Sequence, residues 1–327
     1  MKILITGIAG FVGKHLLGHL LNCDANSQHD YTEILGVDVN FKNFEVESFT
    51  AGKDRLKIIE ADLRNKETAE RLIKDFKPEQ IFHLAAQSSV DFSWENPRET
   101  FEMNVFSGIN ILESIKKHCG DCCKILVACT AEEYGESGYD EKGIKEDQGI
   151  YPSNPYAISK AALDFFCTTY QRVFKLPVFI TRSFNHTGPG QSERFVISDF
   201  AKQIAEIEKM GKDPVVFVGN LNVYRDFLDV RDVVRAYTNI LNKGQFGEVY
   251  NVCSGRKSKI SDLLEILISY SVVPNITINQ NKNKLRPIDR ETIYGNNAKL
   301  IAHTGWKPEY NIRQSLLDTL NWWRERS

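Results

Sequence analysis

The feature that most constrains the fold is a regular alternation of short apolar runs with segments of helical spacing. The apolar runs are continuous rather than interrupted by polar residues, which is typical of strands covered on both faces of a sheet. They lie at residues 2–7, 33–38, 55–62, 80–86, 124–130 and 176–184. Helical segments separate them, at 11–22, 65–76, 97–118 and 154–174. This order predicts an α/β fold with a doubly wound, Rossmann-like parallel sheet.

The pattern becomes looser after about residue 190. There we expect helices near 193–210, 230–242 and 260–271, strands at 214–219 and 248–255, and an exposed loop in the polar run 279–284. We predict a larger Rossmann domain over residues 1–186, with returning segments near 225–255. A smaller, interwoven C-terminal domain over 187–327 would bind substrate, with a cleft between the two parts.

The composition is that of an ordinary globular protein. Hydrophobic residues make up 42% of the chain and charged residues 26%, and the net charge is −2. This balance favours neither a nucleic-acid partner nor a membrane surface. We see no basic leader and no apolar segment long enough to span a bilayer, so we expect a cytoplasmic protein.

The seven cysteines are odd in number and scattered, which fits reduced thiols better than a disulfide framework. The run "HCGDCC" at 118–123 lacks a second ligand pair at metal-site spacing. We interpret it as a helix end followed by a turn, and we expect no metal site.

A glycine-rich turn follows the first predicted strand. The stretch "TGIAGFVGKH" places Gly7, Gly10 and Gly13 between that strand and the first helix. Such a turn lets the backbone approach a pyrophosphate at the helix N-terminus. The second strand ends in Asp38, whose carboxylate can accept hydrogen bonds from a ribose and would repel a 2′-phosphate. We therefore predict NAD rather than NADP as the cofactor, with Asp62 at the end of the third strand near the adenine.

Tyr156 and Lys160 lie four residues apart in "PYAISKAALDFF", so they share one face of a predicted helix. A free tyrosine has a pKa near about 10 and is a poor base at neutral pH. A neighbouring ammonium and an oxidised nicotinamide would favour the phenolate, which could then take a proton from a hydroxyl group. Thr130, at the end of a predicted strand, could hydrogen-bond the same oxygen.

Together these motifs resemble the extended short-chain dehydrogenase/reductase family, which acts on nucleotide-sugars. The resemblance runs essentially from end to end. It also includes "HLAA" (83–86) and Asn104. The strings "TRSFNHTGPGQ" (181–191), "FAKQIAEIE" (200–208), "YRDFLDVRDV" (224–233) and "LRP" (285–287) are similar to one subgroup. It contains the GDP-mannose 4,6-dehydratases and the GDP-4-keto-6-deoxy-mannose reductases, and the reductases are the most similar.

The resemblance implies roles for particular positions. Asn185 and Arg225 would hold the diphosphate of a GDP-linked sugar, Arg286 would assist at the nucleotide, and Ser88 or Ser89 would face the sugar. It also implies homodimers that pair the helices near 97–118 and 154–174. The cofactor pocket would contain the three glycines, Asp38, Asp62, Tyr156 and Lys160. Its other members would be Phe11, Val12, Leu63, Leu84, Ala85, Ala86 and Phe184.

Two glutamates after Thr130 bear on the reaction. In the dehydratases that the chain resembles, a glutamate two positions after this threonine removes the C5 proton, and here that position is Glu132. We interpret Glu133 as a loop charge that points to the other side of an extended chain. Ala131 departs from the pattern, because those dehydratases carry there an Asp or Ser that helps to protonate the leaving hydroxyl.

Our prediction is an NAD-dependent GDP-sugar 4,6-dehydratase, a lyase of deoxy- or amino-sugar biosynthesis. It would oxidise C4, eliminate water across C5–C6 and return the hydride to C6, with Thr130, Glu132, Tyr156 and Lys160 as catalytic residues. The alternative is a GDP-4-keto-6-deoxy-sugar 4-reductase, which explains Ala131 without further assumption. A 4-epimerase ranks below it, and a non-catalytic dinucleotide sensor comes last.

Overall fold

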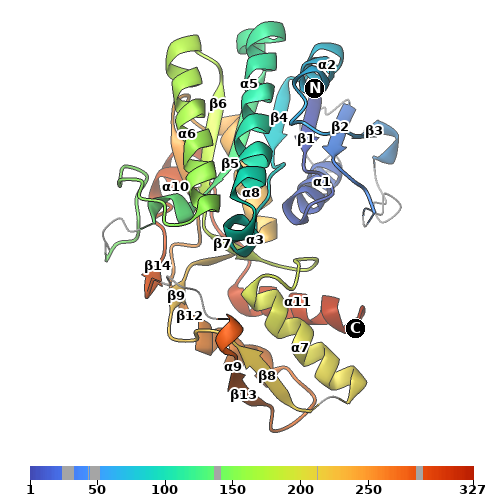
Figure 1. Cartoon of the computed structure of the whole chain (residues 1–327), viewed down its shortest axis with the longest axis vertical. Helices are drawn as coiled ribbons and strands as arrows, with labels where there is room; N and C mark the ends of the chain where they lie inside the picture. The colour runs from blue at the N-terminus through green and yellow to red at the C-terminus, as the bar shows by residue number, and fades with distance from the viewer. Residues whose placement is uncertain (24–32, 43, 45–51, 136–140, 212, 285–289) are drawn as a thin grey trace.

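A seven-stranded parallel sheet forms the centre of the molecule (Figure 1). The computed structural model describes residues 1–327 except 24–32, 43, 45–51, 136–140, 212 and 285–289. The strand order is β11-β6-β5-β4-β1-β2-β3 and every pairing is parallel, so the predicted doubly wound sheet is confirmed. The strands are β1 (Lys2–Thr6), β2 (Glu33–Asp38), β3 (Leu56–Glu60), β4 (Gln80–His83), β5 (Lys124–Thr130), β6 (Val178–Ser183) and β11 (Val249–Val252).

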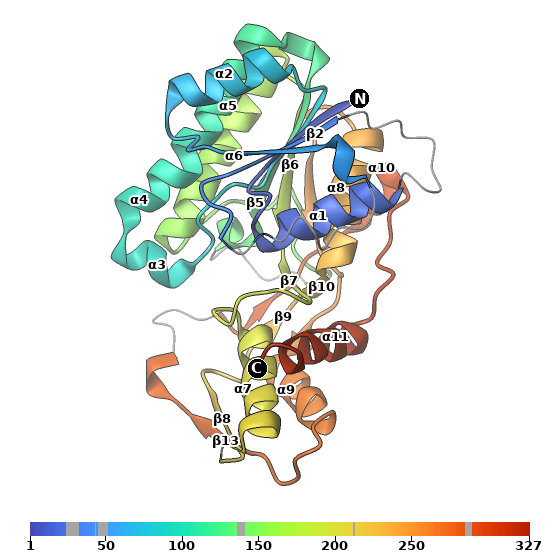
Figure 2. The same cartoon turned by 90° about the vertical axis from the view of Figure 1, so that its right-hand side faces the viewer.

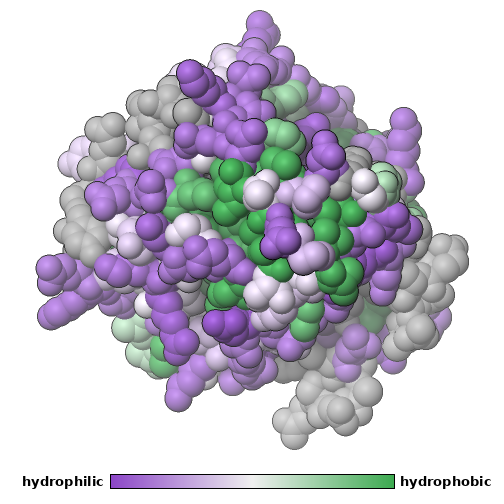
Figure 3. All heavy atoms as spheres, turned by 90° about the horizontal axis from the view of Figure 1, so that it is seen from below, coloured by the Kyte–Doolittle hydropathy of each residue, from purple (hydrophilic) through white to green (hydrophobic). Residues whose placement is uncertain are grey.

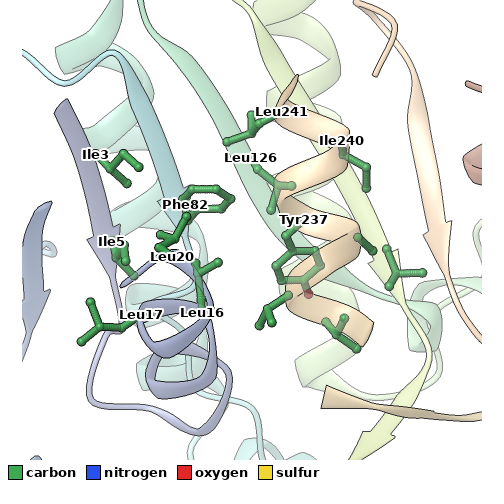
Figure 4. Packing of buried hydrophobic residues seen from close by; sticks show 14 of the residues in the cluster. Ile3, Ile5, Leu16, Leu17, Leu20, Phe82, Leu126, Tyr237, Ile240 and Leu241 are labelled. Atoms are coloured by element: carbon green, nitrogen blue, oxygen red, sulfur yellow. The ribbon is translucent and has the colours of Figure 1, made fainter. Parts of the chain in front are cut away.

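Helices cover both faces of this sheet (Figure 2). On one face α1 (Phe11–Cys23) packs beside α8 (Val230–Lys243), and α10 (Ala298–Thr304) joins the same apolar core. On the other face lie α2 (Lys66–Phe76), α5 (Ser107–His118) and α6 (Pro155–Phe174). Figure 4 shows how leucines of α1 and Tyr237 of α8 flank Phe82 and Leu126 of the strands. The strands therefore need continuous apolar sequence, because both of their faces are buried.

The helix predicted over 97–118 is present but is not uniform. It consists of α4 (Pro97–Phe101), a π-helical segment at Glu102–Phe106 and then α5. A short helix that the sequence pattern did not predict, α3 (Val90–Glu95), precedes it. After α5 the chain forms a 3₁₀ turn at Gly120–Cys122, as expected for the cysteine-rich run.

A second, smaller group of elements lies below the sheet in Figure 1 and has its own apolar core. It contains α7 (Val196–Met210), β8 (Val215–Val218), α9 (Ile260–Ser269), β13 (Thr277–Gln280) and α11 (Ile312–Arg324). Short strands connect the two parts: β7 (Asn185–Thr187), β9 (Tyr224–Arg225), β10 (Phe227–Asp229), β12 (Ser258–Lys259) and β14 (Thr292–Ile293). The division into domains at residues 186 and 187 stays a prediction.

One expectation for this part is wrong. The run 279–284 is not wholly a loop, since Asn279 and Gln280 belong to β13, and a 3₁₀ turn follows at Lys282–Lys284. The reason is that β8 offers an open edge, and β13 pairs with it in parallel. Seen from below, this end of the molecule carries an apolar area among hydrophilic residues (Figure 3). Among the described residues, no helix has both the length and the apolarity needed to cross a membrane.

His83, the last residue of β4, is buried at the edge of the sheet where the strands end. Its Nδ1 lies 2.9 Å from Thr6 Oγ1, and Nε2 has no hydrogen-bond partner among the described residues. Burial, together with the nearby Lys160, lowers the pKa of His83 from 6.5 to about 3. The folded protein therefore holds this imidazole neutral at pH values where the unfolded chain would protonate it.

We predict that this histidine makes the fold acid-sensitive. Its contribution to stability is complete above pH 6.5 and is lost as the pH falls towards 3, because only the unfolded state then binds the proton. Between pH 6 and 4 the wild-type free energy of unfolding should fall by roughly 1.4 kcal/mol per pH unit more than that of His83→Asn. Urea unfolding at several pH values measures the free energy of unfolding of the wild type and of His83→Asn. Parallel pH dependences would contradict the prediction.

Candidate active site

The glycine turn lies at the carboxyl edge of the sheet, between β1 and α1. Gly7 has a φ of +72° and donates its N–H to Val37 O at 2.8 Å, which fixes the turn against β2. A Cβ on Gly13 would lie 2.3 Å from Gly7 O, so a side chain there would collide with the turn itself. The backbone can therefore approach a ligand closely, and Phe11 and Val12 follow as the first residues of α1. This geometry fits the pyrophosphate of a dinucleotide.

Two carboxylates lie at or just after the ends of the neighbouring strands β2 and β3. Asp38, at the end of β2, accepts hydrogen bonds from Ala9 N at 3.0 Å and from Val39 N at 2.8 Å. The turn and the acid are thus held together. Asp62 is engaged by Arg64, whose guanidinium donates to both carboxylate oxygens and lowers the pKa of the acid. The side chain predicted to reach the adenine is therefore in an ion pair with Arg64.

The remaining predicted cofactor residues follow the neighbouring strands. Leu63 is buried just after β3, and Leu84, Ala85 and Ala86 are half-buried after β4. A Cβ on Gly7 would lie 2.7 Å from Ala85 N and 2.8 Å from Leu84 C, so Leu84 and Ala85 directly adjoin the glycine turn. Phe184 is buried after β6. The predicted cofactor residues thus lie around the carboxyl edge of the sheet.

Thr130, Tyr156 and Lys160 come together at the same edge. Thr130 is the last residue of β5, and its hydroxyl is hydrogen-bonded to the phenol of Tyr156. Lys160 lies one turn further along α6, where its ammonium donates to Ala128 O of β5 at 2.8 Å. Helix α6 begins here because Asn154 caps it, accepting from Ala157 N at 2.8 Å, and Pro155 occupies its first position.

Burial dominates the electrostatics of this pair. Burial raises the pKa of Tyr156 above that of a free tyrosine, and the hydrogen bond from Thr130 opposes this only in part. Burial also lowers the pKa of Lys160. The ammonium therefore does not turn the phenol into a phenolate in the protein alone, because the loss of water around both groups is the larger effect.

The segment after Thr130 is a 3₁₀ turn at Ala131–Tyr134 and not an extended chain. Glu132 is consequently half-buried and accepts a hydrogen bond from Asn154 Nδ2 at 3.4 Å. The interpretation of Glu133 as a loop charge is wrong. Its side chain is fully buried, because the turn carries it back under the end of β5.

A pocket opens beside these residues and extends to the short strands β9 and β14, which connect the two parts of the molecule. Its inner portion is lined by Thr130, Glu132, Phe184 and Asn185, and Arg225 borders both its inner and outer portions. Arg225 is buried and donates to the carbonyl oxygens of Tyr224 and Arg290, at 2.8 Å each. A guanidinium and an amide at one pocket can bind an anionic group.

Other predicted substrate residues lie elsewhere. Ser88 is exposed, and the hydroxyl of Ser89 caps α3 by accepting from Phe92 N at 3.2 Å. Neither is among the residues that line the pocket. Arg286 lies outside the described residues.

The structure adds pocket residues that the sequence reasoning missed. Asp91 and Trp94 of α3 line the outer portion, together with Arg290. The guanidinium of Arg290 donates to Gly135 O, which ties it to the chain just after the 3₁₀ turn. No local pattern marks these positions, because α3 is short and Arg290 is separated from the catalytic residues by more than a hundred positions.

Asn104 supports the pocket from behind. It is buried in the π-helical segment, where its side chain accepts from Gln87 N at 2.7 Å and donates to Gln87 O at 3.0 Å. It also donates to Ser159 Oγ of α6 at 2.9 Å. The asparagine therefore connects the chain after β4 to the helix that carries Tyr156. Single π-helical turns are frequent at functional sites, and only the structure shows that Asn104 lies in one.

Comparison with known proteins gives a consistent result. The chain matches the family described as GDP-mannose 4,6 dehydratase over residues 4–319. GDP-6-deoxy-D-mannose reductase of Pseudomonas aeruginosa is 33% identical over 325 residues, with 99% of this chain and 98% of the relative covered. The dTDP-D-glucose 4,6-dehydratase of Bos taurus is 30% identical, with 99% of this chain and 89% of the relative covered.

Solved structures agree with the sequence relatives. RMD from Pseudomonas aeruginosa complexed with NADPH has a TM-score of 0.82 and 32% identity, with 100% of this chain and 99% of that chain covered. A dTDP-glucose 4,6-dehydratase from Bacillus anthracis in complex with NAD has a TM-score of 0.82 and 25% identity, with 99% and 97% covered. These cofactors and the glycine turn together support a nicotinamide dinucleotide in this protein.

The end-to-end match, the shared sheet and the placement of Thr130, Tyr156 and Lys160 lead to one conclusion. The chain belongs to the GDP-mannose 4,6-dehydratase family, among the nucleotide-sugar enzymes of the extended short-chain dehydrogenases/reductases.

Proposed function

We propose that this protein is an oxidoreductase that reduces the C4 ketone of a GDP-linked 4-keto-6-deoxy sugar. The observation that carries the proposal is Ala131, which borders the pocket between Thr130 and Glu132 with only a methyl group. A dehydratase needs an acid for the leaving C6 hydroxyl, whereas a ketone reduction needs no such group. The similarity to the Pseudomonas aeruginosa GDP-6-deoxy-D-mannose reductase supports the same choice.

The residues present suit a reduction. A bound nicotinamide dinucleotide supplies the hydride that C4 receives. A tyrosine is protonated at neutral pH, and burial raises the pKa of Tyr156 further, so its phenol can donate a proton to the C4 oxygen. The Thr130 hydroxyl, bonded to that phenol, is placed to hold the same oxygen. One hydride and one proton convert the ketone to a hydroxyl, which balances the reaction. The Lys160 ammonium stabilises the phenolate that remains.

The other end of the substrate would lie at Arg225 and Asn185, which border the inner portion of the pocket. The planar guanidinium of Arg225 is suited to paired phosphate oxygens. Arg290, on the outer portion of the same pocket, adds a second positive charge for a diphosphate. The role of Arg286 at the nucleotide stays a prediction.

A GDP-sugar 4,6-dehydratase is the second candidate, and Glu132 favours it. Its carboxyl borders both portions of the pocket, where it could remove a proton from C5 of a 4-keto sugar. The similarity to a dTDP-D-glucose 4,6-dehydratase points the same way. In this reaction water would leave across C5–C6 and the hydride would return to C6. The acid for the leaving hydroxyl has no assigned residue.

Mass spectrometry of the sugar nucleotide separates the two reactions. We expect the wild type to add two mass units to GDP-4-keto-6-deoxy-mannose when NADH or NADPH is supplied. Glu132→Gln should keep this activity within about threefold, while Tyr156→Phe should lower it by about 10²–10⁴-fold, because the proton donor is lost.

The same assay can also contradict the proposed reductase activity. Loss of one water from GDP-mannose without added reductant, abolished in Glu132→Gln, would make the protein a dehydratase. No turnover of either sugar, with nicotinamide dinucleotide still bound, would exclude both reactions.

We propose NAD(H) as the preferred cofactor. The support comes from Asp38, whose carboxylate is fixed beside the glycine turn by two backbone N–H groups. A 2′-phosphate at this position would meet a negative charge, whereas free ribose hydroxyls could donate to it.

Asp38→Ala should remove that discrimination. The ratio of kcat/KM for NADH to that for NADPH is expected to fall at least about tenfold, which corresponds to about 1.4 kcal/mol of lost selectivity. Asp62→Asn is the control, since any adenine contact is common to both cofactors and the ratio should stay the same. A wild type that prefers NADPH would refute the role of Asp38.

We also propose a homodimer that pairs the helices near 97–118 and 154–174 of two copies of the chain. The helices α5 and α6 lie side by side in Figure 1. The exposed apolar side chains here are Phe106, at the end of the π-helical segment, and Ile158, Phe165 and Phe166 of α6, and Phe165 is 58% exposed. A group of exposed apolar side chains on neighbouring helical segments is typical of a protein interface.

Phe165→Asp should therefore convert the dimer to a monomer in sedimentation experiments, because it places a charge in the apolar contact. The control is Val272→Asp, which changes a residue that is 80% exposed in the smaller part of the molecule. It should leave the association state unchanged. A wild-type monomer, or a dimer that survives Phe165→Asp, would contradict this pairing.

A further inference from the structure

Asp226 is a buried carboxylate at the pocket that the proposed reaction does not use. It lies between β9 and β10, directly after Arg225, and it is only 1% exposed. It nevertheless borders the inner portion of the pocket. A carboxylate is rarely buried to this extent without partners. The partners of Asp226 therefore indicate what it holds in place.

Four hydrogen bonds satisfy this carboxylate. Its Oδ1 accepts from Ser254 N at 2.8 Å and from Ser254 Oγ at 2.6 Å. Its Oδ2 accepts from Gly255 N at 3.0 Å and from Gly295 N at 3.3 Å. Backbone N–H groups can only donate, so this geometry suits an ionised carboxylate that accepts at both oxygens. Burial raises the pKa of Asp226 to about 6, which leaves the carboxyl ionised at neutral pH.

The donors belong to the two strands that flank Arg225. Strand β9, which ends at Arg225, is the middle strand of a three-stranded sheet. It pairs with β12 in antiparallel and with β14 in parallel orientation. Ser254 and Gly255 lie in the chain just before β12, and Gly295 follows β14. One carboxylate thus ties both neighbouring strands to the residue next to Arg225.

Strand β14 also leads to the group that holds the guanidinium. Arg225 donates to Arg290 O at 2.8 Å, and Arg290 lies two residues before β14 begins. At the other end of β14, Asp226 N donates to Ile293 O at 3.1 Å, and the Asp226 carboxylate accepts from Gly295 N. The place of the Arg290 carbonyl, and with it the direction of the guanidinium, therefore depends on how Asp226 fixes β14.

We propose that Asp226 is a positioning residue for substrate binding, which fixes β12 and β14 around Arg225 and so directs the guanidinium towards the diphosphate of the sugar nucleotide. The inference rests on the proposed function, because it uses the assignment of Arg225 to the diphosphate. It holds for the reductase and the dehydratase alike. Asp226 acts through Arg225 and takes no part in the transfer of hydride or proton.

Asp226→Asn is the variant that tests this role. It keeps the shape of the side chain but replaces one acceptor oxygen by an amino group, which then faces backbone N–H donors. Isothermal titration calorimetry should show a Kd for GDP that is about tenfold higher than in the wild type. The KM for the sugar nucleotide should rise by a similar factor, with kcat within about threefold of the wild type.

Asp232→Asn is the matched control. Asp232 of α8 is also buried, and its Oδ2 accepts from Glu309 N at 3.0 Å and from Tyr310 N at 2.9 Å. It is not among the residues that line the pocket. The variant therefore makes the same chemical change to a buried carboxylate that holds backbone N–H groups elsewhere. Its Kd for GDP should equal that of the wild type.

A double-mutant cycle with Arg225→Ala separates positioning from a general loss of structure. If Asp226 acts through the guanidinium, Asp226→Asn should change the Kd for GDP less than about twofold in the Arg225→Ala background. Additive effects of the two substitutions would overturn the proposal. An unchanged or lower Kd for GDP in Asp226→Asn alone would overturn it as well.

Ser254→Ala provides a milder variant in case Asp226→Asn fails to fold. It removes the hydroxyl donor at 2.6 Å and leaves the three backbone donors in place. The Kd for GDP should then rise about threefold, because one of four bonds is lost. A Kd equal to that of the wild type would contradict the positioning role.

Failure of the proposed function would be recognised separately. A wild type that binds GDP but turns over neither sugar nucleotide would refute the proposed reactions, while the calorimetric comparison would still decide the role of Asp226. A wild type that binds no GDP would overturn the assignment of Arg225 and, with it, that of Asp226.

Discussion

The register of the parallel sheet determines where every functional group lies. Thr6 is paired with His83, His83 with Val127, and Thr130 with Ser183, so the ends of β1, β4, β5 and β6 form one edge. The residues that follow each strand are therefore neighbours, although they are far apart in sequence. The glycine turn, the alanines after β4, the 3₁₀ turn after β5 and Phe184 all meet there. Ligands of open α/β sheets bind at this edge.

Burial gives this edge its chemistry. Removing water from Tyr156 and Lys160 favours the neutral form of each, and the hydrogen bond from Thr130 opposes this in part for Tyr156. A protonated tyrosine is the form that a ketone reduction needs, which agrees with the absence of an acid at Ala131. The interpretation of the site as a reductase thus rests on Ala131 in the turn after β5, and the protonated Tyr156 of α6 is compatible with it.

Much of the fold could be predicted, because the constraints are local. Continuous apolar runs mark the strands, and the Asn154–Pro155 pair marks the start of the helix that carries Tyr156 and Lys160. Glu133 could not be placed, because its burial depends on a 3₁₀ turn and on Arg182, which lies 49 positions later. Arg290 and β13 were missed for the same reason, since their partners are distant in sequence and carry no pattern of their own.

The most direct measurement of the central claim follows a single hydrogen atom. The protein is given GDP-4-keto-6-deoxy-mannose and a nicotinamide dinucleotide deuterated at its transferable position, and NMR locates the label in the sugar. The account predicts deuterium at C4 of the product, in one equivalent for each cofactor consumed. An unlabelled sugar, together with release of water from GDP-mannose without net cofactor consumption, would contradict it.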